Sequence, residues 1–477
     1  MGIVLTFALN AVLNLVVGLV VAGVLGPAEY GRFAIASMAA IVLFTALFDW
    51  VRLSATRFTH GDAKEAGLDA SLDAAYLAMV ALVLVGAAGI AVAGPSLGLP
   101  PGLVLVVAVA AAATGLIEIG AARTRALFLN GAYIRLILAK NVLAFVLMVA
   151  AAWLTHSALW VLAMFALANG LASLASGRRL RPVPSALSKA TRNHLATFAR
   201  YGFPIVVANL VYQGIVLLNR GVVADRFGFA EAGQLSLATD LTIRLFLSVG
   251  AALDAYLFQV AVRRQAEEGE AEGRRQIALN MLIVLAVLSF LGASYAAAMP
   301  ALEAIFVPQQ FRGSFGPLAL AMLPGVLAFC FGQFAVGPVF QLTHRTSALL
   351  WTTLVALAVD GVLLWFVPAE AGLLAIAAIH SLSLAAGLLA ALVTASSLRG
   401  CWPTLGQVGT VLLAALLALG AMWPMRSLGS PWLALIAAGL VGPVVFAGTL
   451  WLLDLGGLRQ ALASQVRRLR RASASPT

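Results

Sequence analysis

Long apolar runs separated by short polar breaks cover almost the whole chain of 477 residues. A helix needs roughly 20 apolar residues to cross the hydrocarbon core of a bilayer. Runs of about that length occur at 3–25, 33–53, 74–93, 102–121, 134–154, 158–175, 203–223, 235–258, 277–298, 317–341, 347–367, 371–395, 406–425 and 431–452. The pattern predicts an all-α polytopic membrane protein with about fourteen transmembrane helices. Composition agrees, because 62% of the residues are hydrophobic and only 10% are charged, whereas a soluble domain carries about 25% charged residues.

Basic residues alternate between crowded and nearly empty loops. If the N-terminus is cytoplasmic, 22 of the 30 Lys and Arg residues fall in the loops and the tail on the cytoplasmic side. The loops on the other side hold only Arg32, Arg226, Arg312 and Arg426. Because an excess of Lys and Arg marks cytoplasmic loops, we predict that both termini are cytoplasmic. Topology therefore accounts for the formal charge of +11 without a nucleic-acid partner.

One short motif occurs twice. Residues 25–32, LGPAEYGR, return as FGFAEAGQ at 227–234, with Gly and Glu positions repeated at a constant offset of 202. Six predicted spans separate the copies, so both copies have the same orientation in the membrane. This predicts two parallel six-helix lobes around a central cavity, plus two extra C-terminal helices. The predicted divisions are an N-terminal lobe with a basic linker (1–200), a C-terminal lobe (201–395), the last two helices (396–453) and a basic cytoplasmic tail (454–477).

The repeated motif itself has the composition of a turn between two helices. Gly26 suits the C-terminal end of the first helix, and Pro27 suits the first turn of the next. Glu29 favours the positive N-terminal end of a helix, and Gly31 permits close helix approach. We therefore expect this loop to define the architecture without taking part in chemistry.

The first sixty residues resemble a known family. An apolar span, then LGPAEYGRFAIA at 25–36, then a second span ending FDWVRLSATRF at 48–58, is similar to the N-terminus of the bacterial polysaccharide (O-antigen type) flippases. These belong to the multidrug/oligosaccharidyl-lipid/polysaccharide exporter superfamily, which includes lipid II flippases and multidrug-and-toxin extrusion transporters. The resemblance implies a V-shaped pair of lobes around a hydrated cavity in the bacterial inner membrane. It also implies transport of an undecaprenyl-pyrophosphate-linked oligosaccharide, with polymerase and export machinery as partners.

Several charged residues lie within the predicted spans. A charge at the bilayer centre costs at least about 2.5–3.5 kcal/mol, so each should face a partner or water. At 100° per residue, polar residues form stripes on spans one, two, seven and eight. These stripes comprise Asn10 and Asn14; Thr45, Asp49 and Arg52; Asn209, Tyr212, Asn219 and Arg220; and Asp240, Arg244, Ser248 and Asp254. We predict that the stripes face one another across the cavity.

The basic members of these stripes, together with Lys140 of span five, are candidate pyrophosphate ligands. Guanidinium groups bind phosphate oxygens through two parallel donors, which favours Arg52, Arg244 and Arg220. The structural alternative pairs Asp49 with Arg52 and Asp240 with Arg244, and lets Arg220 and Lys140 extend to the membrane surface. The rest of the predicted cavity comprises Asn10, Asn14, Asp49, Asn209 and Tyr212.

Two lone polar residues lie in the middle of later spans, Asp360 in span eleven and His380 in span twelve. Each is either a coupling site for protons or sodium, or a hydrogen-bonded contact between helices. Offset 202 also aligns Arg52 with Asp254. Opposite charges at equivalent inner ends would form an inner gate.

Two alternatives remain for the function. A multidrug or organic-cation antiporter of the same fold would favour acidic groups in the cavity, and the spans hold five acids against four bases. A membrane glycosyl polymerase would carry a large outer loop, which the pattern lacks. No enzyme motif, cofactor motif or metal-ligand spacing occurs. The two cysteines are 71 residues apart, Cys330 in an apolar run and Cys401 in a short loop, and they suggest neither a disulfide framework nor a metal site. The basic tail is expected to contact anionic lipids at the cytoplasmic face.

Overall fold

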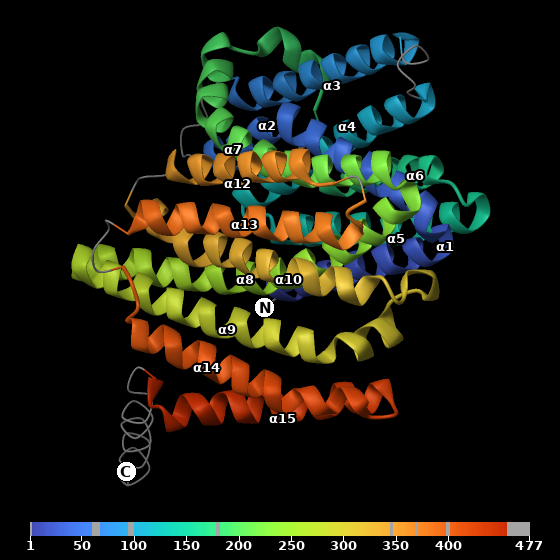
Figure 1. Cartoon of the computed structure of the whole chain (residues 1–477). Helices are drawn as coiled ribbons and strands as arrows, with labels where there is room; N and C mark the ends of the chain where they lie inside the picture. Colours follow the sequence, from blue (N-terminus) through green and yellow to red (C-terminus); the bar gives the residue numbers. More distant parts are fainter. Residues whose placement is uncertain are drawn as a thin grey trace, which may run out of the picture. The chain divides into compact units, whose positions relative to one another are not determined.

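A computed structural model of the chain describes residues 2–59, 67–93, 100–177, 182–343, 347–368, 370–396 and 401–455. These residues are almost entirely helical, as Figure 1 shows. Thirteen helices within this described part are long and apolar enough to cross a membrane. Lys64, Arg178, Arg179, Arg181, Arg345, Arg399 and the basic tail from Gly456 lie outside the described residues.

The helices cluster into two compact units. The first unit comprises Met1–Leu241, Pro308–Phe311 and Asp360–His380, and the second comprises Thr242–Val307, Arg312–Val359 and Ser381–Thr477. The long helices that lie wholly in the first unit are α1 (Gly2–Leu47), α3 (Leu68–Ala93), α4 (Pro101–Ala126), α5 (Asn130–Thr155), α6 (Ala158–Ala172) and α7 (Arg192–Arg226), and the shorter α2 (Asp49–Phe58) belongs with them. Those wholly in the second unit are α9 (Glu270–Phe306), α10 (Phe315–Phe331), α11 (Gly337–Leu342), α14 (Leu405–Met422) and α15 (Pro431–Leu452). The unit boundary cuts α8 (Phe229–Glu268), α12 (Ser347–Phe366) and α13 (Leu373–Ala395).

The first predicted span and most of the second form one helix, α1, which is broken at Gly26, and the end of the second span, 49–53, lies in the short helix α2. Gly26 has φ 74 and ψ 170, a conformation that is open to glycine and strained for residues with a Cβ. The predicted helix end at this glycine is therefore confirmed, and Pro27 begins the second segment. This break explains why thirteen helices contain the fourteen predicted spans.

The two copies of the repeated motif pack against each other. A Cβ atom on Gly31 would collide with the Phe229 carbonyl oxygen and the Gly233 nitrogen. Reciprocally, a Cβ on Gly233 would collide with the Pro27 carbonyl oxygen and the Gly31 nitrogen. Residues 27 and 31 correspond to 229 and 233 at the offset of 202, so this exchange of equivalent contacts is what a local twofold axis produces. The prediction that Gly31 permits close helix approach is confirmed, and its partner is the other copy of the motif.

Glu29 of this motif stabilises a different helix end from the one predicted. Its carboxylate accepts a hydrogen bond of 2.9 Å from the backbone N–H of Ala158 at the start of α6. It also pairs with Arg32 at 2.5 Å. An acidic group at the N-terminus of α6 complements the positive end of that helix.

The short helix α2 is held between α4 and α7 by two glycines. The ring of Phe48, which is fully buried, lies against Gly115 of α4, where an added Cβ would come within 2.8 Å of the ring. Trp50 lies against Gly202 of α7, where an added Cβ would come within 2.7 Å of the Trp50 Cβ. These two close contacts fix the direction in which α2 presents its polar residues.

We expect Gly202→Ala to destabilise the protein, because the new methyl group would meet Trp50 rather than open space. Overpacking of this kind costs roughly 1–3 kcal/mol. Alanine is otherwise the better helix former by about 1 kcal/mol, so the matched variant Gly214→Ala, with nothing within 4 Å of its new Cβ, should be neutral or stabilised. Thermal unfolding of the detergent-solubilised protein measures both variants. Equal melting temperatures for the two would contradict this packing.

In the second unit, α14 and α15 form a hairpin against α9 (Figure 1). Small side chains, including Ala293 and Ala297 of α9 and Ala438 of α15, form the core between these helices. The C-terminal end of α8 and the N-terminal end of α9 are charged and meet at Gly269. They contain the i,i+4 pairs Arg263–Glu267 at 2.9 Å and Arg274–Glu270 at 2.7 Å.

Candidate functional site

A polar network in the first unit begins at the N-terminus of α2. The Asp49 side chain is 3% exposed and pairs with the Arg52 Nε at 2.5 Å. Asn209 of α7 donates from Nδ2 to the second Asp49 oxygen at 3.2 Å. Asp49 lies in the first turn of α2, where its charge complements the helix dipole. The structural alternative predicted for Asp49 and Arg52 is therefore present, and Arg52 nevertheless remains 25% exposed.

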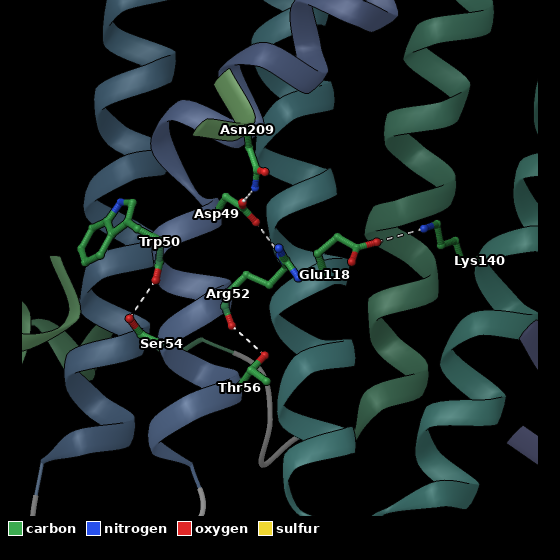
Figure 2. Close-up of polar contacts among 8 residues, drawn as sticks. All are labelled: Asp49, Trp50, Arg52, Ser54, Thr56, Glu118, Lys140 and Asn209. Atoms are coloured by element: carbon green, nitrogen blue, oxygen red, sulfur yellow. Dashed lines mark hydrogen bonds and ion pairs between the residues drawn. The ribbon is translucent and has the colours of Figure 1, made fainter. Parts of the chain in front are cut away.

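The same network continues through α4 to α5. Glu118 of α4 pairs with Lys140 of α5 at 3.2 Å, and their side chains are 30% and 20% exposed. Glu118 also interacts electrostatically with Arg52. Figure 2 shows Arg52 directed toward Glu118, with Lys140 on the far side of that carboxylate and Asn209 reaching Asp49 from α7.

The charges of this network balance. Arg52 and Lys140 carry two positive charges, and Asp49 and Glu118 carry two negative charges. An anionic ligand would displace the carboxylates and take the two basic groups, whereas a cationic ligand would take the two acids. Four helices contribute to the network, so its geometry depends on the glycine contacts that position α2.

A second polar cluster in the first unit is more deeply buried. Arg220 of α7 is 4% exposed, pairs with Asp240 of α8, and donates to the Ala34 carbonyl at 3.0 Å. The structural alternative in which Arg220 extends to the membrane surface is therefore wrong. Burial inside a membrane protein favours an acidic partner, and Asp240 provides one.

Asp360 and His380 belong to this same cluster. Asn219, one residue before Arg220, donates from Nδ2 to an Asp360 oxygen at 2.8 Å. Asp360 and His380 are 0% and 2% exposed, and His380 interacts electrostatically with Arg220. Two residues that look isolated in the sequence thus lie in one cluster with the buried Arg220 and with its partner Asp240, whose side chain is 24% exposed.

The remaining predicted residues are placed as follows. Asn14 and Tyr212 are half-buried in α1 and α7, and both make polar or ring contacts. Asn10 lies in α1 among residues whose side chains the structure leaves undescribed. Arg244 is exposed and Asp254 is half-buried, and both belong to the second unit, whereas Arg52 belongs to the first. The alignment of Arg52 with Asp254 as an inner gate stays a prediction.

Two ion pairs went unrecognised in the sequence. Glu118 lies near the end of the predicted span 102–121, and its partner Lys140 lies 22 residues away on the next helix. Arg123 lies just beyond the same predicted span, but α4 extends through it, and it is buried with Asp73 of α3 at 2.6 Å. The only sequence signal for either pair was a charged residue close to the end of an apolar run.

Comparison of the whole chain with known proteins identifies its fold. It resembles "Lipid II flippase MurJ, inward closed conformation" with a TM-score of 0.74 and 13% identity, covering 94% of this chain and 98% of that chain. It also resembles the inward-facing conformation of a multidrug resistance MATE family transporter of the MOP superfamily, with a TM-score of 0.53 and 17% identity, covering 86% and 95%. A MATE transporter in the straight conformation gives a TM-score of 0.53 at 15% identity, covering 88% and 95%. No family model and no curated protein matches the sequence. The chain therefore has the fold of the MOP-superfamily transporters, as a multi-pass membrane protein.

Proposed function

We propose that this protein is a flippase that moves an undecaprenyl-pyrophosphate-linked oligosaccharide across the bacterial inner membrane by alternating access. The product would serve surface polysaccharide or exopolysaccharide synthesis. The fold supports transport, since its structural neighbours are transporters, and the polysaccharide branch rests on the resemblance of residues 1–60. One observation carries the choice of an anionic substrate: both bases of the network are partly exposed, Arg52 at 25% and Lys140 at 20%, whereas of its two acids only Glu118 is, since Asp49 is 3% exposed.

The proposed headgroup ligands are Arg52 and Lys140. Arg52 pairs with Asp49, and Lys140 pairs with Glu118, which also interacts with Arg52, so a pyrophosphate that binds both cations can replace these carboxylates. The bidentate geometry of guanidinium suits two phosphate oxygens, and the ammonium of Lys140 acts as a mobile point charge. Arg244, Asn14, Asn209 and Tyr212 are proposed to line the path of the headgroup between two lobes, with both termini cytoplasmic.

The alternative is an organic-cation antiporter, which the acids of the same network support. Asp49 and Glu118 could bind a cation, and Asp49, at 3% exposed, is the most buried charged group of the network. Proteoliposomes containing the purified protein distinguish the two functions. We expect flipping of a fluorescent undecaprenyl-pyrophosphate sugar and no uptake of ethidium, and the reverse result would establish the antiporter.

The buried cluster of Arg220, Asp240, Asp360 and His380 is proposed to couple transport to an ion gradient. The two acids, the arginine and the histidine all belong to membrane-spanning helices. Together they can exchange a proton or a small cation when the cluster opens. The deep burial of Asp360 means that a change of its charge must be balanced within the cluster. Such a balance links ion binding to rearrangement of α7, α12 and α13.

We expect Asp360→Asn to remove gradient-driven transport. The amide is close in shape to the carboxylate but carries no charge to exchange. Flipping in proteoliposomes should then proceed at the same rate with and without an imposed pH or sodium gradient. Asp225→Asn, which changes an exposed acid near the end of α7, should keep the response of the wild type. If the Asp360→Asn variant still responded to the gradient, Asp360 would serve only as a contact between helices.

A further inference from the structure

A small pocket in the second unit lies where the loop between α14 and α15 meets α9. Its volume is about 80 Å³, whereas one water takes about 30 Å³ of the liquid. The pocket therefore has room for a group of several heavy atoms. Its walls are the small or apolar residues Ala297, Ala301, Met425, Pro431, Ala434 and their neighbours, and Arg426 is the one charged residue among them.

The guanidinium of Arg426 is held rigidly in this pocket. Its central carbon lies 4.0 Å from the centre of the Trp423 ring, a stacking distance. Its Nε–H group is buried and has no acceptor among the described residues. Because that buried N–H is closed to a partner from outside, the part of the guanidinium that lines the pocket is the part that an anion can reach.

The other three arginines predicted at the outer face differ from Arg426. Arg32 pairs with Glu29 at 2.5 Å, and Arg312 donates from Nε to the Val307 carbonyl at 2.9 Å. Arg226 donates to the carbonyls of Val367 and Leu364 at 3.3 and 3.2 Å. Each of these three guanidinium groups has a hydrogen-bond or ion-pair partner in the protein, whereas that of Arg426 stacks on Trp423 and lines a pocket.

The surroundings of the pocket are those of a membrane interface. Trp423 and Trp432 are 51% and 58% exposed, and the Trp432 ring contacts Phe306 with centroids 6.2 Å apart. Exposed tryptophans gather at the headgroup level of membranes. Pro431, at the N-terminal turn of α15, lines the same pocket, and the positive end of that helix adds attraction for an anion.

We infer that Arg426 and its pocket bind a phosphate-type anion, carried either by an outer-leaflet lipid headgroup or by free phosphate. The guanidinium provides the donors, Trp423 fixes its plane, and the small apolar side chains leave room for the anion beside it. This site lies in the unit that lacks Arg52, and its occupancy does not require the proposed transport function.

Native mass spectrometry of the protein in dodecyl maltoside tests the inference with two probes, phosphatidylglycerol and inorganic phosphate. We expect Arg426→Gln to weaken binding of one probe by at least about tenfold, and Arg312→Gln to bind like the wild type. If Arg426→Gln loses binding of phosphatidylglycerol, and phosphate does not displace this lipid from the wild type, the ligand is a lipid headgroup. If the variant loses only the binding of phosphate, the ligand is the free anion. Unchanged binding of both probes by a folded Arg426→Gln protein overturns the inference.

A second variant keeps the test decisive if Arg426→Gln does not fold. Ala434→Leu fills the pocket and leaves the guanidinium in place, so the same loss of binding is expected. Full binding by Ala434→Leu would show that the anion is held elsewhere.

Discussion

Arg52→Ala is expected to abolish flipping of the lipid-linked oligosaccharide while the protein remains folded in the membrane. Removing a bidentate charged donor to a phosphate costs on the order of 3 kcal/mol, or about a hundredfold in rate. Arg52→Lys should retain part of the rate, because it keeps the charge and loses the planar pair of donors. Initial rates of flipping in proteoliposomes measure all three proteins. Arg57→Ala, an exposed arginine on the same helix, should transport at the wild-type rate.

Asp49→Asn separates a role in substrate binding from simple ion pairing. If Arg52 serves only to neutralise Asp49, the two substitutions should be equally harmful, since each breaks the same 2.5 Å pair. If Arg52 binds pyrophosphate, Asp49→Asn should preserve or increase flipping, because the guanidinium then loses a competitor. Loss of transport in Asp49→Asn together with normal transport in Arg52→Ala would instead favour a cationic substrate.

Gly31→Ala and Gly233→Ala are each expected to stop transport and lower the melting temperature. The added methyl group meets backbone atoms of the other motif copy, which cannot rotate away as a side chain can. The helices must separate, and we expect a loss of roughly 3 kcal/mol or more, at the upper end for overpacked contacts. Thermal unfolding and flipping rates of the purified variants measure the effect.

The control for the glycine crossing is Gly18→Ala in the first segment of α1, with nothing within 4 Å of its new Cβ. This variant should be as stable as the wild type or more so, because alanine is the better helix former by about 1 kcal/mol. If Gly31→Ala behaved like Gly18→Ala, the contact between the two motif copies would not be needed for folding or for transport.

Several features of the site could be predicted from residue spacing alone. Asp49 and Arg52 are three residues apart on one helix, so their pairing follows from helical geometry. The doubled motif predicted an internal twofold relation, and Gly31 and Gly233 make that relation visible as reciprocal contacts. Gly26 was predicted as a helix end because glycine readily adopts the positive φ found there.

Other features depended on which helices become neighbours. Arg220 was placed with the headgroup ligands, but a partner on α8 and a carbonyl of α1 make it part of a buried cluster. Lys140 gains Glu118 from a different helix, and Asp360 gains Asn219 over a separation of 141 residues. Periodicity assigns a residue to a face of its own helix and contains no information about the helix opposite.

The sequence by itself determined the class of this protein, its membrane spans and its internal repeat, and it singled out Asp49 and Arg52. It could do so because hydrophobic length and helical period are local properties of the chain. Only the tertiary structure decided which charges on different helices meet. In the first unit it divides them between a partly exposed network around Arg52 and a buried cluster around Arg220 and Asp360, because the pairing of charges inside a membrane follows from helix packing.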